Sequence, residues 1–281
     1  MRVKICADST CDLSPELVER YNINILPLYV TLDGKTRQDG VNITPADILG
    51  HVDNGGDLPS TAAITPEDYS EEFRRFSAEY DAVVHITIGS GFSSCYQNAC
   101  IAASDFNNVY PIDSQNLSTG QGLVVVEAAR RAAAGMEIGQ LLAEVQGMIP
   151  RVEASFLIDR LDYMRKGGRC STVAALGANL LKLKPCIEVV DGKMSVVKKY
   201  RGNFDKCIAT YIRERLENRA DALERTQAFI THAPTEEAIL EAARAAAAQY
   251  GQFEDVFETD AGCTVSSHCG PNTLGILFIR K

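Results

Sequence analysis

Residues 82–94 read AVVHITIGSGFSS, an apolar run that passes directly into a loop of glycine and serine. The run from Ala82 to Ile88 has the length and composition of a strand. The loop Gly89–Ser94 follows, and we expect a helix to begin near Ser93. A strand, a short loop and a helix in this order form the repeating unit of an α/β fold.

The same order recurs through the first half of the chain. Ser14-Pro15, Thr44-Pro45 and Thr65-Pro66 mark three helix starts, because Ser and Thr hydroxyls cap helices and Pro fits the first turn. Asp47 and Asp68 add negative charge in the first turn of two of these helices. The other elements predicted in this half are strands at Val3–Ala7, Ile23–Val30 and Val109–Ile112 and a buried helix at Gly122–Ala134.

A second unit is predicted to begin near Val152. Within it, Asp191-Gly192 should join two strands, Ile187–Val190 and Met194–Lys199, because Asp-Gly favours the tight turns of hairpins. The remaining predicted elements are strands at Ala154–Ile158, Ala228–Thr231, Val256–Glu258, Val265–His268 and Leu274–Ile279 and helices at Phe204–Asn218 and Glu236–Tyr250. The sequence therefore predicts two α/β domains, residues 1–152 and 153–281.

Bulk properties exclude several classes of protein. The 281 residues carry a net charge of −9, with a pI near 5.1, which argues against general DNA or RNA binding. No apolar run approaches the roughly 20 residues that span a bilayer, so we expect a cytoplasmic protein with at most transient membrane contact. The nine Cys should be reduced and mostly buried, and the four His do not cluster with them, so no metal site or cofactor is predicted.

One segment departs from this acidic background. Residues 161–185 read LDYMRKGGRCSTVAALGANLLKLKP, in which the cations Arg165, Lys166, Arg169, Lys182 and Lys184 accompany a glycine pair. From residue 160 to 201 there are ten Lys or Arg and three Asp or Glu, a balance of +7 that leaves −16 for the rest. Such a segment suits recognition of an anion or an acidic partner, although a solvated helix-and-turn face is the alternative.

Three hydroxyl-rich elements are predicted where strands end: Asp8-Ser9-Thr10, Ser60-Thr61 and Gly89–Ser94. Open α/β sheets bind ligands beyond the carboxyl ends of their strands, where helix N-termini and hydroxyls offer donors to a carboxylate or a phosphate. Helix capping uses the same residue types and is the alternative role. We assign Ser14, Thr44 and Thr65 to capping, and Thr61 and Ser93 to ligand binding.

Sequence signatures of catalysis are weak. The glycines match neither a GxxxxGK[ST] phosphate loop nor GxGxxG, and Gly89–Ser94 lacks the last glycine of a GxSxG elbow. His268, predicted to follow a strand, could act as a base or donate a hydrogen bond. Asp8 and Asp113 end strands as catalytic acids often do, but each precedes Ser, and such turns are common.

Taken in order, these motifs resemble the DegV family of bacterial fatty-acid-binding proteins. The resemblance covers nearly the whole chain, and it rests on Asp8–Leu13, Ser60-Thr61, Gly91–Gln97, Asp113-Ser114 with Ser118, Gly120 and Gly122, Leu161–Ser171, Leu181–Pro185 and His268–Pro271. The order and spacing are specific, and LDYMRKGGRCS is the strongest single motif.

The resemblance implies a two-domain α/β protein that buries one long-chain fatty acid, such as palmitate, stearate or oleate, with its carboxylate near the domain junction. Thr61 and Ser93 would bind the carboxylate, Ser94 would assist through its N–H, and His268 would lie beside the head group. A partner-facing or phosphate-facing surface would include Arg165, Lys166, Arg169 and Arg201. A separate fatty acid kinase would phosphorylate the carboxylate for phospholipid synthesis, so the protein itself would be a carrier and not an enzyme.

Five residues at three places depart from the usual family pattern. Ala62-Ala63 stands for Gln-Pro, Ser94-Cys95 for Gly-Thr, and Asn272 for Gly. These changes are expected to alter the mouth of the pocket. Two other functions remain open at this stage: a hydrolase or acyl transferase that uses Ser93 with His268, and a lipid-free adaptor that docks an acidic partner.

Overall fold

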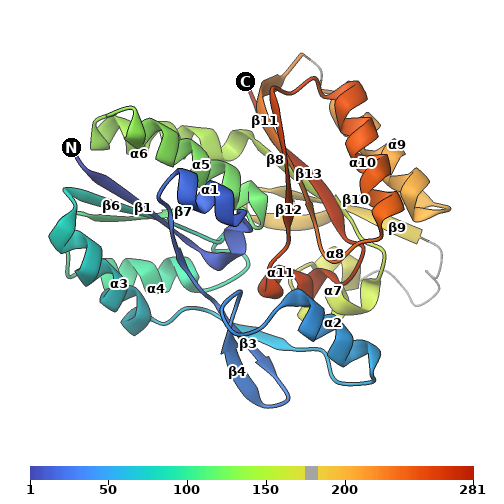
Figure 1. Cartoon of the computed structure of the whole chain (residues 1–281), viewed down its shortest axis with the longest axis horizontal. Helices are drawn as coiled ribbons and strands as arrows, with labels where there is room; N and C mark the ends of the chain where they lie inside the picture. Colours follow the sequence, from blue (N-terminus) through green and yellow to red (C-terminus); the bar gives the residue numbers. More distant parts are fainter. Residues whose placement is uncertain (175–182, 220) are drawn as a thin grey trace.

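The computed structural model describes residues 1–174, 183–219 and 221–281, and shows two lobes side by side with short helices between them (Figure 1). Leu181 and Lys182, the first two residues of the Leu181–Pro185 motif, lie outside the described residues. The chain is α/β as predicted. Three sheets organise the described part of the chain, and two of them form the lobes.

A parallel sheet forms the N-terminal lobe. Its strands are ordered β2-β1-β6-β7, with bounds β1 Val3–Asp8, β2 Asn24–Leu26, β6 Ala82–Thr87 and β7 Val109–Asp113. Every residue of β6 is buried, as expected for an inner parallel strand covered on both faces. The helices of this lobe are α1 Pro15–Arg20, α3 Pro66–Glu79, α4 Cys95–Ala103, α5 Thr119–Ala133 and α6 Ile138–Met148.

The predicted helix caps are confirmed. Ser14 accepts a hydrogen bond from the Leu17 N–H, and Thr44 and Thr65 each form a capping box with the Asp three residues later. Thr44 caps α2, which spans Pro45–Asp53. These caps depend only on local sequence, which is why the sequence predicted them.

The single strand predicted at Ile23–Val30 is wrong. Pro27 interrupts it, since Pro lacks the N–H that a sheet ladder needs. The chain continues after this break as β3 Tyr29–Leu32, in a three-stranded antiparallel sheet with β4 Lys35–Gln38 and β5 Ser60–Ala62. Ser60-Thr61 therefore lies within a strand, not after one.

A mixed six-stranded sheet forms the C-terminal lobe. Its order is β10-β9-β8-β13-β11-β12, with bounds β8 Val152–Leu157, β9 Leu183–Val190, β10 Lys193–Arg201, β11 Leu223–His232, β12 Asp255–Asp260 and β13 Leu274–Arg280. Helices α9 Phe204–Glu217 and α10 Glu237–Tyr250 pack beside it (Figure 1). The predicted hairpin is confirmed, and its turn residues Asp191 and Gly192 both have positive φ.

The strand predicted at Val265–His268 is wrong, because these residues lie in helix α11, Cys263–Cys269. Two carboxylates from the N-terminal lobe hold the start of this helix. Asp39 accepts the N–H groups of Cys263 and Thr264 at 2.7 and 3.1 Å, and Asp12 accepts that of Gly262 at 2.9 Å. Residues so distant in sequence could not signal a helix there.

The cationic motif begins as helix α7, Leu161–Gly167, which ends at Gly168 in the left-handed region. Helix α8, Ser171–Ala174, follows directly. Short 3-10 turns lie at Ser9–Cys11 and Ile149–Arg151. Helices α7, α8 and α11 lie between the lobes, close to α2 (Figure 1).

A hydrophobic core runs across the two lobes. It includes Val84 of β6, Val124 of α5 and Ala154 of β8, and α5 packs against strands of both lobes. A smaller core lies between the mixed sheet and α9 and α10. The domain boundary at residue 152 remains a prediction, and the continuous core indicates that the two halves are closely joined.

Free thiols occupy mostly interior positions. Eight of the nine Cys are buried, and Cys100 is exposed. Within the described ranges, no group of His, Cys, Asp and Glu could hold a metal ion. None of the described helices is both long and apolar enough to cross a membrane.

Candidate ligand-binding site

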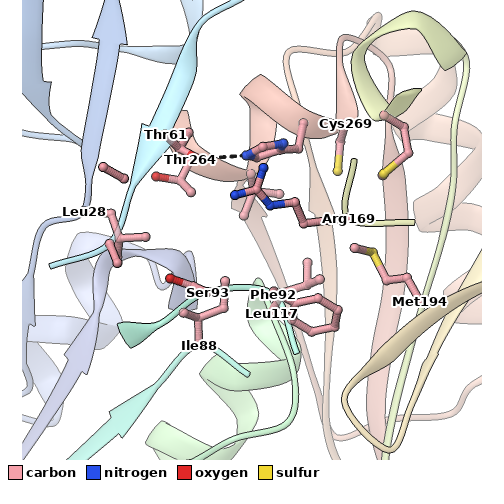
Figure 2. A pocket seen from close by; sticks show the side chains of 15 residues that line it. Leu28, Thr61, Ile88, Phe92, Ser93, Leu117, Arg169, Met194, Thr264 and Cys269 are labelled. Atoms are coloured by element: carbon pink, nitrogen blue, oxygen red, sulfur yellow. Dashed lines mark hydrogen bonds between the residues drawn. The ribbon is translucent and has the colours of Figure 1, made fainter. Parts of the chain in front are cut away.

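A cavity lies between the lobes at the carboxyl ends of the parallel strands. Its space, counted together with the open solvent at its mouth, is about 560 Å³. Leu28, Ile88 and Leu117 reach it from segments that follow β2, β6 and β7. Most of its wall is apolar, and the polar side chains are Thr61, Ser93, Arg169, Thr264 and His268 (Figure 2).

A second cavity adjoins the first. Leu117, Val265 and Cys269 line both, so the two spaces share a wall. The second encloses about 430 Å³ and extends between the loop before α5 and the inner strands of the mixed sheet, past Phe156 and Leu277. A polar mouth therefore lies next to a second, mostly apolar space.

Thr61 and His268 form the polar centre of the mouth. Thr61 comes from β5 and His268 from the last turn of α11, and Thr61 Oγ1 lies 2.8 Å from His268 Nε2 (Figure 2). The other ring nitrogen, Nδ1, is buried and has no hydrogen-bonding partner among the described residues. A buried N–H without a partner is costly, so the neutral ring carries its proton on Nε2 and donates to Thr61. The Thr61 hydroxyl proton is then available to a ligand.

His268 is held neutral by its surroundings. Burial lowers its pKa to about 4, and the positive charge of Arg169 acts in the same direction. The ring packs against Gly167, where an added Cβ would lie 2.3 Å from Nδ1. The glycine of the cationic motif thus allows α7 to approach α11 closely.

Ser93 lies in the loop between β6 and α4, facing the cavity from the opposite lobe (Figure 2). Its Oγ accepts the Cys95 N–H at 3.3 Å and lies 3.2 Å from the Cys95 Sγ. Ser94 is exposed and is the residue before α4, and its side chain makes no capping hydrogen bond. Gly91 in the same loop permits contact with the β9–β10 turn, since a Cβ there would lie 2.1 Å from the Gly192 carbonyl oxygen.

The predicted cations separate into different environments. Arg169 joins the cavity wall, and its guanidinium donates to the Gly167 carbonyl at 2.7 Å. Lys166 is exposed and lies 3.8 Å from Asp57. Arg165 is half-buried near the end of α7, and Arg201 is exposed at the end of the edge strand β10. The structure therefore brings Arg169 together with Thr61, Ser93 and His268, while Arg165, Lys166 and Arg201 do not line the cavity.

The first predicted hydroxyl element does not line the cavity. Asp8 is fully buried and accepts three hydrogen bonds, while Ser9 and Thr10 bond to Asp39 and Gln121. Asp113 accepts hydrogen bonds from Ser90 and Gln115. These aspartates therefore have structural partners within the N-terminal lobe.

Sequence reasoning missed several wall residues. The sequence predicts a strand at Val265–His268, directly after Thr264. Both Thr264 and Val265 instead lie in helix α11, which places them in the cavity wall. Met164 and Met194 carry no local signal of ligand contact. Ala62 and Ala63, which depart from the usual family pattern, line the cavity, and their effect on its mouth stays a prediction.

Comparison with known proteins now identifies the family. The profile described as "uncharacterised protein, DegV family" matches residues 2–281. The chain belongs to the DegV family. A DegV domain-containing protein of Caldanaerobacter subterraneus is 30% identical over 100% of this chain and 99% of that protein.

Solved DegV structures share the fold. One, described as fatty acid binding of a DegV family protein from Thermus thermophilus, has a TM-score of 0.90 at 28% identity and covers 100% of both chains. A stearic acid-binding protein from Eubacterium ventriosum has a TM-score of 0.87 at 27% identity, covering 99% of this chain and 98% of that one. DegV proteins related to this chain therefore bind fatty acids.

Asn272, which stands where the usual family pattern has Gly, has a structural explanation. Its φ is +58°, in the left-handed region that Gly adopts easily and Asn tolerates better than most residues. The side chain also donates to Asp159 at 3.1 Å and accepts the Glu236 N–H at 3.3 Å. Asn272 thus occupies a left-handed backbone conformation that Gly would also adopt, and its side chain adds two hydrogen bonds.

Proposed function

We propose that this protein binds one long-chain fatty acid, such as palmitate, stearate or oleate, and presents its carboxylate to a separate kinase. The observation that carries the proposal is a mostly apolar cavity between the lobes whose mouth holds the hydroxyls of Thr61 and Ser93. Related DegV structures that bind fatty acids support it. No cofactor is required for binding.

The carboxylate would bind at the mouth. Thr61 would donate one hydrogen bond, with its oxygen held by His268, and Ser93 would donate another from the loop after β6. The exposed Ser94 would assist through its N–H. Arg169 supplies positive potential from the cavity wall, whereas neutral His268 adds none.

The acyl tail would pass Leu117 and Val265 into the second cavity. Burial of about 15 methylenes at about 0.8 kcal/mol each gives roughly 12 kcal/mol of gross driving force. Hydrogen bonds to the charged head add about 1.5–3 kcal/mol each before desolvation, and association removes much of the total. The tail therefore supplies affinity, and the hydroxyls orient the head group.

A kinase would then act on the exposed end of the ligand. Transfer of a phosphoryl group to a carboxylate oxygen gives an acyl phosphate, which could serve phospholipid synthesis in the cytoplasm. Because Arg169 lies in the cavity wall, we propose that it faces the head group and that the partner surface consists of Arg165, Lys166 and Arg201. Net charge −9 suits only transient contact with an anionic membrane.

Hydrolase or transferase chemistry at Ser93 and His268 is less favoured by the geometry. His268 Nε2 bonds Thr61, and Ser93 Oγ bonds Cys95, so within the described part of the chain the two are not a nucleophile–base pair. A lipid-free adaptor is less favoured because it gives the cavity no role.

Native mass spectrometry of protein purified from cells tests the proposal directly. We expect one added mass, identified after denaturation as a long-chain fatty acid. Delipidated protein should gain thermal stability from oleate and should show no turnover of an acyl ester. A protein that emerges empty and gains no stability from palmitate or oleate would overturn the proposal.

A further inference from the structure

The loop before α5 contains a strained residue. Ser118 has a φ of 52° and a ψ of −147°, a combination that Gly adopts easily and that costs other residues free energy. The Gly120 N–H donates to the Leu117 carbonyl at 3.1 Å, so Leu117–Gly120 is a tight turn with Ser118 at its second position. Turns with positive φ at this position usually carry Gly there. Ser118 therefore needs neighbours that hold its conformation.

Asp12 supplies one restraint on this turn. Ser118 Oγ and Asp12 Oδ2 are hydrogen-bonded at 2.6 Å, and both residues are buried. The other oxygen of the same carboxyl group, Oδ1, accepts the Gly262 N–H at 2.9 Å. A second restraint acts on the next residue, since Thr119 Oγ1 lies 2.5 Å from Thr231 Oγ1 of β11. The turn is thus fixed between the N-terminal lobe and the mixed sheet.

The two segments that Asp12 joins also supply the wall shared by the two cavities. Leu117 directly precedes Ser118, and Val265 lies three residues after Gly262, in α11. Leu117 and Val265 line both cavities. Ser118 itself lines the second. One carboxyl group therefore fixes the backbone close to both of the residues that the acyl tail is proposed to pass.

We propose that Ser118 and Asp12 are positioning residues that set the spacing of Leu117 and Val265, and with it the fit of a long acyl tail. This inference rests on the proposed function. Without the hydrogen bond to Asp12, Ser118 would relax to negative φ, and the peptide group between Leu117 and Ser118 would rotate. Leu117 would then move relative to Val265. A short tail that ends before these residues should be insensitive to this movement, and a long tail should be sensitive to it.

Two substitutions at Ser118 separate positioning from direct contact with the ligand. Ser118→Ala removes the hydroxyl and leaves a side chain that disfavours positive φ. We expect its oleate affinity to fall about tenfold, the order of the strain that the hydroxyl offsets, and its decanoate affinity to stay unchanged. Ser118→Gly removes the same hydroxyl but adopts the turn freely, so its oleate affinity should match that of the wild type. Displacement of a fluorescent fatty acid from delipidated protein measures both ligands.

The comparison of these variants can overturn the inference. An equal loss of oleate affinity in Ser118→Ala and Ser118→Gly would show that the hydroxyl contacts the ligand directly. An equal loss for decanoate and oleate in Ser118→Ala, or an unchanged oleate affinity, would also contradict the proposal. If Ser118→Ala does not fold, Ser118→Gly decides by itself, because a loss of oleate affinity there is incompatible with a purely conformational role.

Asp12→Asn tests the other partner of the hydrogen bond. The Asn side chain can still accept the Gly262 N–H and can donate to Ser118 Oγ, so both restraints persist. We expect this variant to keep the wild-type ratio of oleate to decanoate affinity. A lowered ratio would contradict the role assigned to Asp12.

Methyl NMR of leucine-labelled protein needs no lipid. The Leu117 methyl signals, identified as the pair that disappears in Leu117→Val, should shift in Ser118→Ala and stay near their wild-type positions in Ser118→Gly. Unshifted Leu117 signals in Ser118→Ala would overturn the inference even in a protein that binds oleate. Shifted signals, together with a wild type that binds neither oleate nor decanoate, would support the positioning of Leu117 and reject the carrier function.

Discussion

Thr61 and His268 are hydrogen-bonded across 207 positions of sequence, with Oγ1 2.8 Å from Nε2. The pair joins β5, a strand of the small antiparallel sheet, to α11, the helix that follows β12 of the mixed sheet. Because neutral His268 donates, the Thr61 proton is directed to whatever occupies the mouth of the cavity. The proposed head-group site therefore requires both segments to be correctly packed.

Removal of the Thr61 hydroxyl should weaken fatty-acid binding. Thr61→Val keeps the shape and the β-branched side chain but loses the donor, and we expect oleate affinity to fall about tenfold or more. His268→Gln should produce a smaller loss, since Gln can still donate to Thr61. Isothermal titration measures both. Thr36→Val on β4 is the matched control, and an equal loss in it would contradict the assignment.

Stability should depend on pH through His268. The pKa of its ring is lowered to about 4 in the folded protein from about 6.5, the ordinary value. Between these values the unfolded chain binds a proton that the folded protein does not, so this contribution is complete above about pH 6.5 and is lost as the pH falls toward about 4. Urea titrations at several pH values should show a steeper fall for the wild type than for His268→Gln. Parallel curves would refute this source of pH dependence.

Gly167→Ala should disturb the head-group site without touching a ligand. The added Cβ would lie 2.3 Å from His268 Nδ1, so the imidazole must move away from Thr61. We expect weaker oleate binding with α7 still folded, since Ala favours helix. Gly147→Ala in α6 meets open space and is the control. Unchanged affinity in Gly167→Ala would show that the His268 position is not critical.

Charge substitutions should separate the head-group site from the partner surface. Arg169→Gln removes a cation from the cavity wall and should weaken oleate binding about three- to tenfold, with the largest effect at low salt. Arg201→Glu, at the end of β10, should leave oleate affinity unchanged and abolish phosphorylation by the partner kinase. Equal oleate affinity in Arg169→Gln and the wild type would return Arg169 to the partner surface.

Leu117 should control access to the second cavity. Because it lines both cavities, Leu117→Phe is expected to narrow the passage between them. The variant should lose affinity for palmitate and oleate while it retains decanoate, as measured by displacement of a fluorescent fatty acid. Ile101→Phe on the exposed face of α4 is the control. Equal losses for all chain lengths would place the tail elsewhere.

Features determined by neighbouring residues were predicted from the sequence alone. The caps at Ser14, Thr44 and Thr65 and the turn at Asp191-Gly192 depend on side chains and backbone preferences within a few positions. The α/β order of elements follows from the same local patterns. The resemblance to DegV proteins also required only the order of short motifs, which is why the family and the fold class could be named before the fold was known.

Tertiary structure alone decided the site. Helix α11 forms because Asp12 and Asp39 hold its first N–H groups from the other end of the chain, and only a helix there places His268 beside Thr61. The place of Arg169 in the cavity wall arises in the same way. Hydrogen bonds and burial are short-range in space but not in sequence, so the chain determines its elements locally and its chemistry only when folded.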